Sequence, residues 1–284
     1  HMKNGQLKPT YNTQISTEDQ FITHYSIHQT AGDTTTLETH LDGFEQQYGK
    51  QSKEVIADAG YGSEENYEMM EQRQIDAYVK YNYFHKEQKR PQKQNPFLVQ
   101  NLYYNESENF FVCPMGQKLE HIGKGKRKST NGFISQVDYY QARRCEGCPL
   151  RGMCHKSAGN KKIEINHKLN QYRAKAREML TSEKGLMHRS KRPIEVEAVF
   201  GQLKSNNKFS RFTLRKMDKV NLEFGLMSIG HNLRKLTQKV LGNHRFLIFC
   251  GHKDLLDLPI YKNQRNQSKF KYLEIYITPI HRAA

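Results

Sequence analysis

The sequence predicts an α/β fold in which a sheet is flanked by helices and the chain is interrupted by an insertion. Short strand patterns alternate with helical patterns up to residue 85, and helical patterns resume after residue 162. Residues 86–162 between them are polar, basic and poor in long apolar runs, which is typical of an insertion rather than of a second large domain. The 284 residues suffice for one large domain of this kind.

The charge balance points to a polyanionic partner. Forty-five Lys and Arg residues stand against twenty-nine Asp and Glu, which gives a formal net charge of +16. Such a surplus favours nucleic acid, because neutralising phosphates releases condensed counterions. A membrane is the weaker alternative, since no strongly amphipathic basic helix stands out and the apolar run at 246–250 is too short to span a bilayer. With no signal-peptide pattern, we expect a cytoplasmic, nucleoid-associated protein.

Two strands and a helix open the chain. Residues 11–17 and 21–29 alternate apolar and polar side chains around a turn at Glu18-Asp19. Asp33 is suited to cap the helix that follows, and this structural role is favoured over a catalytic one. The helix has an apolar face formed by Leu37, Leu41, Phe44 and Tyr48.

Asp58 lies at the carboxyl end of a short, buried-looking strand at 55–57. The residues 59–62 form a turn, a helix follows at 64–72, and another strand at 76–81. Catalytic groups collect at the carboxyl ends of strands in open α/β sheets, and a carboxylate suits a hard cation such as Mg²⁺. The equally plausible alternative is a turn aspartate satisfied by backbone N–H groups.

The insertion contains a cysteine cluster with a CxxC element. In a chain without a secretion signal, such clusters indicate metal more than disulfides, and four thiolates suit a structural zinc ion. The zinc would hold together a segment that looks too polar to fold around its own core. Reduced structural cysteines, or a relic site that no longer holds metal, are equally favoured alternatives. The cluster consists of Cys113, Cys145, Cys148 and Cys154, with His155 or His121 as substitutes for one thiolate and Cys250 as a separate small hydrophobe.

After a helix predicted at 167–187, a second helix is expected to begin at Pro193, which suits a first helical turn. Glu197, Gly201 and Lys204 share one side of it, so the helix could present an acid to a metal and a base to a phosphate. An ordinary solvated polar face is the alternative. The apolar stripe of this helix consists of Val196, Val199, Phe200 and Leu203.

The remaining chain has three predicted parts. Residues 206–219 form a basic loop, a helix of more than four turns follows, and the tail from about 242 ends in a strand-like stretch at 272–280. No chemistry is assigned to the tail. The apolar face of the long helix consists of Leu222, Leu226, Ile229, Leu233 and Leu236.

Two carboxylates from distant parts of a basic chain suit two-metal phosphoryl transfer. At these residues the sequence resembles the DDE transposases of bacterial insertion sequences, in the branch with a cysteine-bearing insertion between the second and third acids. The motifs are VIADAGYGSEEN at 55–66, RPIEVEAVFGQLKSNNKFSRF at 192–212 and EFGLMSIGHNLRKL at 223–236, with a similar stretch at 4–34. The resemblance implies DNA cleavage at transposon ends and joining to target DNA, with Mg²⁺ or Mn²⁺, usually by self-associated proteins.

The resemblance also implies an RNase H-like mixed sheet and a division of the chain. Residues 1–85 would form the first part of the core, 86–162 the insertion, 163–241 the second part and 242–284 a tail. Asp58 matches the second acid, Glu197 the third, and Lys204 the lysine that contacts phosphate. Arg192 is the nearest counterpart of the family arginine, which related branches place one residue later. Glu195 is a neighbouring candidate that lacks the family spacing to Phe200-Gly201.

The first acid of the family has no counterpart here. In the family this acid lies on the first strand, which is central in an RNase H-like sheet. Asp19 is in a turn, and Asp33 follows the strand at 21–29, which would be the third strand of the family fold, so neither can be the first acid. Loss of that strand would leave backbone groups of its neighbours unpaired. We therefore expect a C-terminal fragment of a transposase that is inactive alone.

DNA contacts are expected from clusters of basic residues, and binding should weaken steeply with salt. A different class of function, a non-catalytic DNA-binding module built around the insertion, remains open, as does a degraded element. A ribonuclease or resolvase on the same fold is less favoured. The candidate contacts are Arg192, Lys204, Lys124, Lys126, Arg127, Lys128, Arg143, Arg144, Lys208, Arg211 and Arg215.

Overall fold

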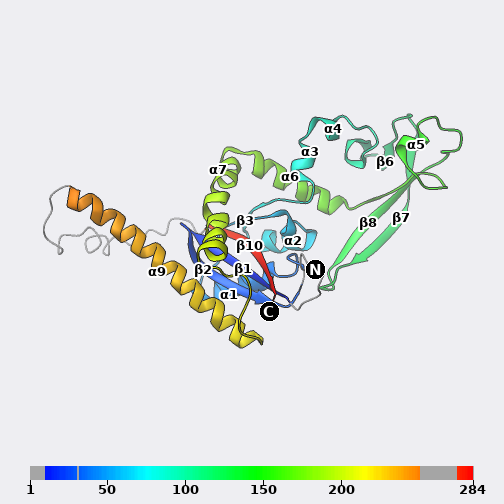
Figure 1. The fold of residues 1–284 in the computed structure, drawn as a ribbon. Helices are drawn as coiled ribbons and strands as arrows, with labels where there is room; N and C mark the ends of the chain where they lie inside the picture. Colours follow the sequence, from blue (N-terminus) through cyan, green and yellow to red (C-terminus); the bar gives the residue numbers. More distant parts are fainter. Residues whose placement is uncertain (1–9, 31, 250–273, 284) are drawn as a thin grey trace. The chain divides into compact units, whose positions relative to one another are not determined.

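The computed structural model describes residues 10–30, 32–249 and 274–283, with side chains for 10–30 and 32–240. The chain divides into two compact units: one holds the residues up to 62, 66–80 and those from 179 onward, and the other holds 63–65 and 81–178. Each unit has its own five-stranded sheet (Figure 1). The predicted mixed α/β architecture is confirmed. Among the helices described, none is long and apolar enough to cross a membrane.

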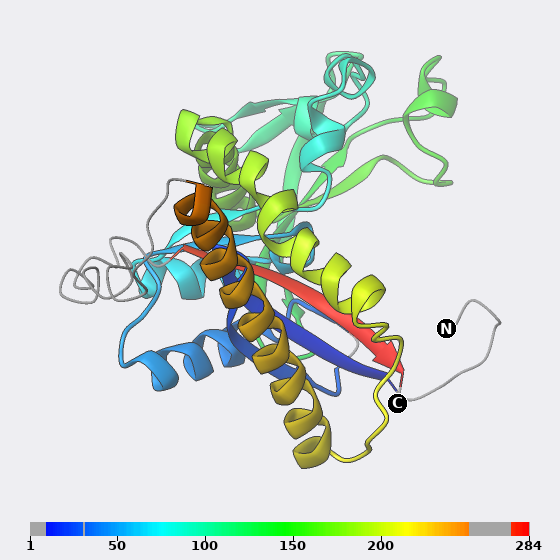
Figure 2. The ribbon, with the colours of Figure 1, turned by 60° about the vertical axis from the view of Figure 1, so that its left-hand side comes forward.

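The sheet of the first unit has the strand order β2-β1-β10-β3-β4. β10 pairs antiparallel with β1 and parallel with β3, and β3 pairs parallel with β4. Both ribbon views show β10, in red, beside the blue β1 (Figures 1 and 2). The strands are β1 (Thr10–Glu18), β2 (Phe21–His28), β3 (Glu54–Ala57), β4 (Asp76–Val79) and β10 (Glu274–Ala283).

The centre of this sheet is therefore filled by a strand from the far end of the sequence. Ile277 of β10 pairs with Ala57 of β3, and Thr278 pairs with Ile15 of β1. The expectation that the neighbours of a missing first strand have unpaired backbone groups is wrong, because β10 supplies the pairing. The strand predicted near 272–280 is confirmed, and it now has a place in the fold.

Helix α1 (Leu37–Tyr48) follows β2, and the predicted apolar face is buried at Leu37, Leu41 and Phe44. The N-cap position belongs to Thr36 and not to Asp33, so the predicted cap is wrong. Asp33 contributes its backbone carbonyl, which accepts a hydrogen bond from the Thr36 N–H at 3.1 Å. The side chain of Asp33 is thereby left for other contacts.

His40 of α1 is fully buried against the sheet. Its Nε2 lies 2.7 Å from the Ser16 hydroxyl of β1, and its Nδ1 lies 2.7 Å from the Ser26 hydroxyl of β2. Burial lowers the pKa of His40 well below its ordinary value, and the nearby His24 and His28 lower it further. A neutral imidazole thus cross-links two strands and a helix.

A nearly unbroken helical run leads to Glu197. The predicted helix at 167–187 is in fact two helices, because Ser182 caps a new one by accepting a hydrogen bond from the Gly185 N–H at 3.1 Å. The expectation that a helix begins at Pro193 is also wrong, since the run continues through it. The segments are α6 (His167–Thr181), α7 (Glu183–Arg192), the π-helical η3 (Pro193–Glu197), α8 (Ala198–Gly201) and the π-helical η4 (Gln202–Asn206).

Helix α9 (Met217–Phe249) confirms the long helix predicted after the basic loop, and it lies along β2. The buried side chains of α9 include Val220 and Phe224, and the Phe224 ring packs edge-on against Tyr25 with ring centres 5.1 Å apart. The predicted leucine-rich face is not the face that is buried. All five of its members are more than half exposed.

The second unit is built on an antiparallel sheet in the order β5-β6-β7-β8-β9. Its apolar core includes Leu119, Tyr140 and Ile163, so the expectation that this segment is too polar to fold around its own core is wrong. Short helices α3 (Phe84–Glu87), α4 (Arg90–Lys93) and α5 (Arg151–Cys154) accompany the sheet. The strands are β5 (Tyr103–Asn105), β6 (Phe110–Val112), β7 (Lys118–Lys128), β8 (Ile134–Ala142) and β9 (Lys162–Ile165).

Candidate active site

Asp58 directly follows β3, a strand whose four residues are all buried. Its backbone is extended, and its carbonyl accepts a hydrogen bond from the Tyr61 N–H at 3.1 Å across the turn Ala59–Tyr61. The Asp58 side chain is 48% exposed. The predicted place at the carboxyl end of a strand is confirmed. The turn fixes the backbone position from which the Asp58 side chain extends.

Glu197 ends the π-helical segment η3. The predicted apolar stripe is fully confirmed, because Val196, Val199, Phe200 and Leu203 are all buried. The stripe fixes the rotation of the helix, so Glu197 on another side is 57% exposed. The π-helical turn accommodates Pro193, which has no N–H to donate and whose ring crowds the preceding turn of an α-helix.

Arg192 brings the two acids together. Its Nη2 lies 3.4 Å from Asp58 Oδ2, and its Nη1 lies 3.4 Å from Glu197 Oε1. The Arg192 side chain is 8% exposed, so one buried guanidinium is shared by two half-exposed carboxylates. Helix α7 holds Arg192 in place, because the buried Glu54 of β3 pairs with Lys184 and, at 3.1 Å, with His188.

Lys80 is a site residue that the sequence reasoning missed. It follows β4, and its Nζ lies 3.7 Å from Asp58 Oδ1. Burial lowers the pKa of Lys80, and the neighbouring Asp58 partly offsets this effect. The sequence held a signal, because Lys80 lies within the strand predicted at 76–81; the observed β4 ends at Val79 and pairs parallel with β3, so Lys80 follows it just as Asp58 follows β3.

The negative charges of the two carboxylates are thus balanced by neighbouring positive charges. Asp58 and Glu197 carry two negative charges, and Arg192 and Lys80 carry two positive ones. Carboxylate oxygens are ligands of the kind that Mg²⁺ accepts, so the donors fit a divalent ion in type. Arg192 competes for the same oxygens. In the ranges that the structure describes, no three His, Cys, Asp or Glu side chains gather closely enough to hold a metal ion.

The other acids considered as candidates have structural contacts. Asp33 accepts a hydrogen bond from the Asn12 side chain at 2.8 Å and lies beside Gly60, where an added Cβ would be 3.1 Å from Asp33 Oδ2. Glu195 accepts a hydrogen bond from the Gln20 N–H at 2.8 Å. Asp19 pairs with Lys239 of α9 at 2.5 Å.

Tyr61 lies buried under the turn that carries Asp58. Burial raises the pKa of Tyr61 well above its ordinary value, and the charges of Asp33 and Asp58 raise it further. The Tyr61 hydroxyl donates a hydrogen bond to the Gln14 side chain of β1. The ring therefore supports the floor of the site as a neutral phenol.

Basic residues continue past Glu197. Lys204 is exposed on η4, with its Nζ 5.3 Å from the centre of the Phe200 ring. The exposed Lys208, Arg211 and Arg215 follow between η4 and α9. The segment that follows Glu197 in the chain is therefore basic and exposed.

Residues 112–237 match the family model described as the transposase DDE domain. The predicted resemblance to DDE transposases is confirmed. The matched segment includes Glu197, Lys204 and the four clustered cysteines, whereas Asp58 lies before it. The DDE match supports a function in DNA transposition, with DNA as partner and divalent metal as the general cofactor of the family. No curated protein and no solved structure gives a significant match.

The DDE match also spans the basic β7–β8 ribbon. A register shift between His121 and Gly123 precedes an alternating stretch, in which Lys124, Lys126 and Lys128 share one face. These three lysines are exposed, and no ion pair or hydrogen bond of their ammonium groups is found in the described part of the chain.

The arginines of the ribbon are paired instead. Arg127 on the other face binds Glu164 through two hydrogen bonds at 2.9 and 2.6 Å, and Arg143 pairs with Glu120. Arg144 is exposed, and its backbone N–H bonds the Gln117 side chain at 2.9 Å. Among these basic residues, the lysine face is therefore the part best able to meet an anion.

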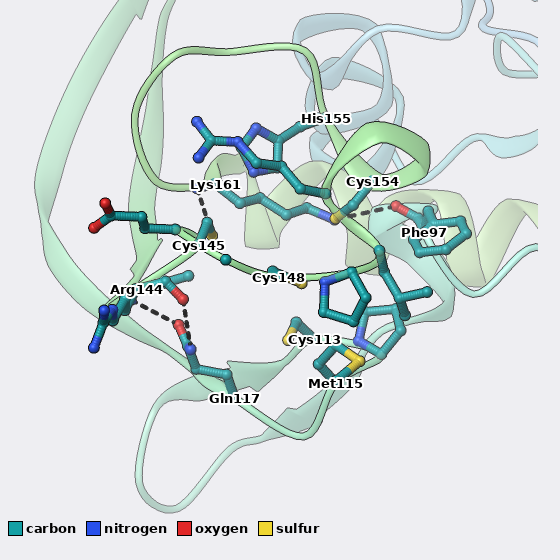
Figure 3. A pocket seen from close by; sticks show the side chains of 17 residues that line it. Phe97, Cys113, Met115, Gln117, Arg144, Cys145, Cys148, Cys154, His155 and Lys161 are labelled. Carbon is teal, nitrogen blue, oxygen red and sulfur yellow. Dashed lines mark hydrogen bonds between the residues drawn. The ribbon is translucent and has the colours of Figure 1, made fainter.

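All four clustered cysteines of the DDE-matched segment line one cavity of about 390 Å³ (Figure 3). The buried Lys161 lies there as well, with its Nζ 3.3 Å from Cys154 Sγ and its N–H 3.3 Å from Cys145 Sγ. His155 lines the same cavity, whereas His121 pairs with Asp138 at 2.8 Å on the ribbon. Cys250 lies outside the described residues.

Proposed function

We propose that this chain carries the DNA-cleaving and DNA-joining centre of a transposase, with Asp58 and Glu197 as its metal-binding acids. The observation that carries the proposal is the meeting of these carboxylates, from distant parts of the chain, on one buried guanidinium. A bound Mg²⁺ or Mn²⁺ would supply Lewis-acid stabilisation of the attacking and leaving oxygens. Lys204, exposed beyond Glu197, would bind a phosphate beside the cleaved bond.

The sheet is best interpreted as an RNase H-like core in which β10 takes the place of the first strand. Its support is the strand order, with β10 antiparallel to β1 and parallel to β3. In the described part of β10 the acid is Glu274, and it pairs with Glu54 at the start of β3. The register position beside Asp58 thus has no carboxylate.

This arrangement leads to a centre that does not cut DNA by itself. Two acids balanced by Arg192 and Lys80 attract a divalent ion less than a cluster of three would. The test measures Mn²⁺ binding by electron paramagnetic resonance and nicking of supercoiled DNA. We expect weak Mn²⁺ binding that is lost in Asp58→Asn and Glu197→Gln, with nicking at background.

Asp42→Asn is the matched control, because Asp42 is an exposed acid paired with Arg73 on another part of the unit. Mn²⁺ binding that neither Asp58→Asn nor Glu197→Gln reduces would rule out this site. Robust nicking that Asp58→Asn abolishes would instead show that two acids suffice.

DNA binding is proposed to reside in the lysine face of the ribbon and in the basic segment after η4. Self-association on DNA and a location at the nucleoid would follow from this role. The three lysines recur every second residue along β7, about 6.6 Å apart, which suits repeated phosphate contacts.

A second candidate function is a DNA-binding module without catalysis. It is favoured by the separate core of the unit containing residues 81–178 and by its exposed lysines. The two proposals differ in their response to mutation. If Cys145→Ser abolishes DNA binding while Glu197→Gln leaves metal binding and every DNA function unchanged, the module is the better description.

We propose that the four-cysteine cavity takes a structural zinc ion, and binding would have to draw the sulfurs closer together than they lie in the described structure. The support is that all four sulfurs line one cavity, with the Lys161 ammonium 3.3 Å from Cys154 Sγ. Gly116 and Gly147 adopt positive φ angles of 76° and 70° in the turns that follow Cys113 and Cys145. Elemental analysis should find one zinc per chain, lost in Cys148→Ser and kept in Ser157→Ala; a metal-free native protein would contradict this.

A further inference from the structure

Helix α9 has an exposed apolar stripe on the side that does not face the sheet. The stripe begins at Leu222 and continues to Leu236, and Val240 extends the same spacing. The exposed fractions are 60% for Leu222, 61% for Leu226, 56% for Ile229, 58% for Leu233 and 51% for Leu236. Large apolar side chains are normally exposed singly, so a row of five requires an explanation.

The opposite face of α9 packs against β2 and the turn before it. Phe224 and His231 are buried, and the Asn232 side chain bonds both the N–H and the carbonyl of Ile22 in β2, each at 2.9 Å. The His231 ring lies 2.9 Å from the Gln20 carbonyl. These contacts fix the rotation of α9, so the stripe cannot turn inward without breaking them.

The spacing of the stripe is that of a coiled coil. Its members are separated by four, three, four and three residues, and Val240 adds another interval of four. Such a repeat of 3.5 residues keeps the apolar residues on a seam that faces another helix. A single helix packed on a sheet has no need of this strict alternation, and the buried face of α9 does not show it.

The stripe is long enough and apolar enough for a specific contact. From Leu222 to Val240 it extends about 27 Å along the helix. Five half-exposed leucine-sized side chains present roughly 500 Å² of apolar surface, at the upper end of what monomers leave uncovered. Two such stripes facing each other would bury about 1,000 Å², the lower limit for a specific interface.

One flank of the stripe permits close approach to a like surface. Gly230 is exposed and has no neighbour within 4 Å of an added Cβ. Glu223 and Thr237 lie with Gly230 on one flank, whereas Gly225, Asn232 and Lys239 on the other flank already contact Tyr25, Ile22 and Asp19. One acid and one base are the only charges among these six positions. Like-charge repulsion between two copies is therefore small, despite the net charge of +16.

We propose that a second copy of this chain covers the stripe, α9 against α9, in a symmetric contact. A self-complementary seam is what a twofold dimer requires, because the same surface must serve both partners. The proposal rests on the proposed function and deepens it, because it names the surface through which the chain would self-associate. It requires neither catalysis nor a bound metal. A dimer would present two DNA-binding surfaces at once.

Sedimentation velocity of the full chain, without DNA or metal, tests this proposal. We expect the native chain to be a dimer and Leu226→Glu/Leu233→Glu to be monomeric with native circular dichroism. The control Asn221→Glu/Gln238→Glu adds the same charges to exposed α9 positions outside the stripe and should stay dimeric. Leu226→Ala/Leu233→Ala, which keeps the helix propensity, should raise the dimer dissociation constant by roughly a hundredfold or more.

A native chain that is monomeric throughout would overturn the proposal, and so would a dimer that survives both leucine variants. If the glutamate variant unfolds, the alanine variant alone decides between these outcomes. Because nicking and Mn²⁺ binding are absent from the experiment, failure of the proposed active site would not affect the result.

Discussion

Ile277 of β10 lies opposite Ala57 of β3, in parallel register at the centre of the sheet. One position further along each strand are Thr278 and Asp58. The place beside the first of the two acids is therefore held by a residue without a carboxylate. The sheet is complete at this point, so the absence of a third acid that we propose would concern one side-chain position.

We predict that Thr278→Asp strengthens divalent metal binding. A third carboxylate beside Asp58 would tip the local charge from balanced to negative, and Mn²⁺ affinity should rise by roughly tenfold or more. Titration calorimetry with Mn²⁺ measures the change. Thr278→Asn is the isosteric control, and equal affinity in the two variants would show that the register position does not reach the site.

We predict that Arg192→Gln also strengthens metal binding, for a different reason. The guanidinium competes for oxygens of Asp58 and Glu197, each at 3.4 Å, and its removal frees both carboxylates. Because both acids are about half exposed, we expect a gain of only three- to tenfold, roughly, for Mn²⁺. Arg189→Gln, one turn earlier on α7, is the control, and weaker binding in Arg192→Gln would contradict the competition.

The lysine face of the ribbon should determine the salt dependence of DNA binding. Lys124→Gln/Lys126→Gln/Lys128→Gln should reduce the slope of log affinity against log salt by up to about 2.7, or about 0.9 for each phosphate contact. Fluorescence anisotropy between roughly 50 and 200 mM salt measures the slope. Arg127→Gln/Arg143→Gln, which alters arginines held by Glu164 and Glu120, should change it far less.

Stability of the first unit should fall in mild acid because of His40. Burial lowers the pKa of His40 in the folded state, so below its ordinary value of 6.5 the unfolded chain binds the extra proton. The stabilisation is fully present above that value and is lost as the pH falls, by at most about 1.4 kcal/mol per pH unit. The pKa values of His24 and His28 are lowered by burial in the same direction.

Urea unfolding from about pH 7.5 to about pH 5 would reveal this slope. His40→Gln should lower the stability but flatten its pH dependence. His85→Gln, at an exposed position of the other unit, should leave the slope unchanged. A slope that is the same in His40→Gln and the native chain would assign the acid sensitivity to other groups.

The parts of the site that depend only on neighbouring residues in the sequence were predictable. Asp58 follows a short apolar strand, and the stripe that fixes Glu197 repeats at helical spacing, so the sequence predicts both positions. Lys80 needed one more step, because its proximity to Asp58 depends on β3 and β4 being neighbours. Arg192 was found through a resemblance, but its shared contact with both acids comes from the packing of α7.

Other features had no local signal. The pairing of β10 with β1 and β3 joins residues more than 200 positions apart, and periodicity does not report strand partners. The leucine face of α9 has helical spacing, which predicts the helix but not which of its faces is buried. Spacing alone does not say which of two apolar faces meets the sheet, and the polar anchors Asn232 and His231 decide it.

The central position of β10 also has a consequence for biosynthesis. Thr10 pairs with Ala283, so the sheet of the first unit cannot close until the ribosome has made residues 274–283. Contacts of such long range make folding slow, because a large loop must be ordered before its contacts form. The unit built on residues 81–178 has its own local sheet and can fold earlier on the nascent chain. Until β10 arrives, the exposed edges of β1 and β3 are open to pairing with other chains, which makes the last stage of synthesis the time of greatest risk of aggregation.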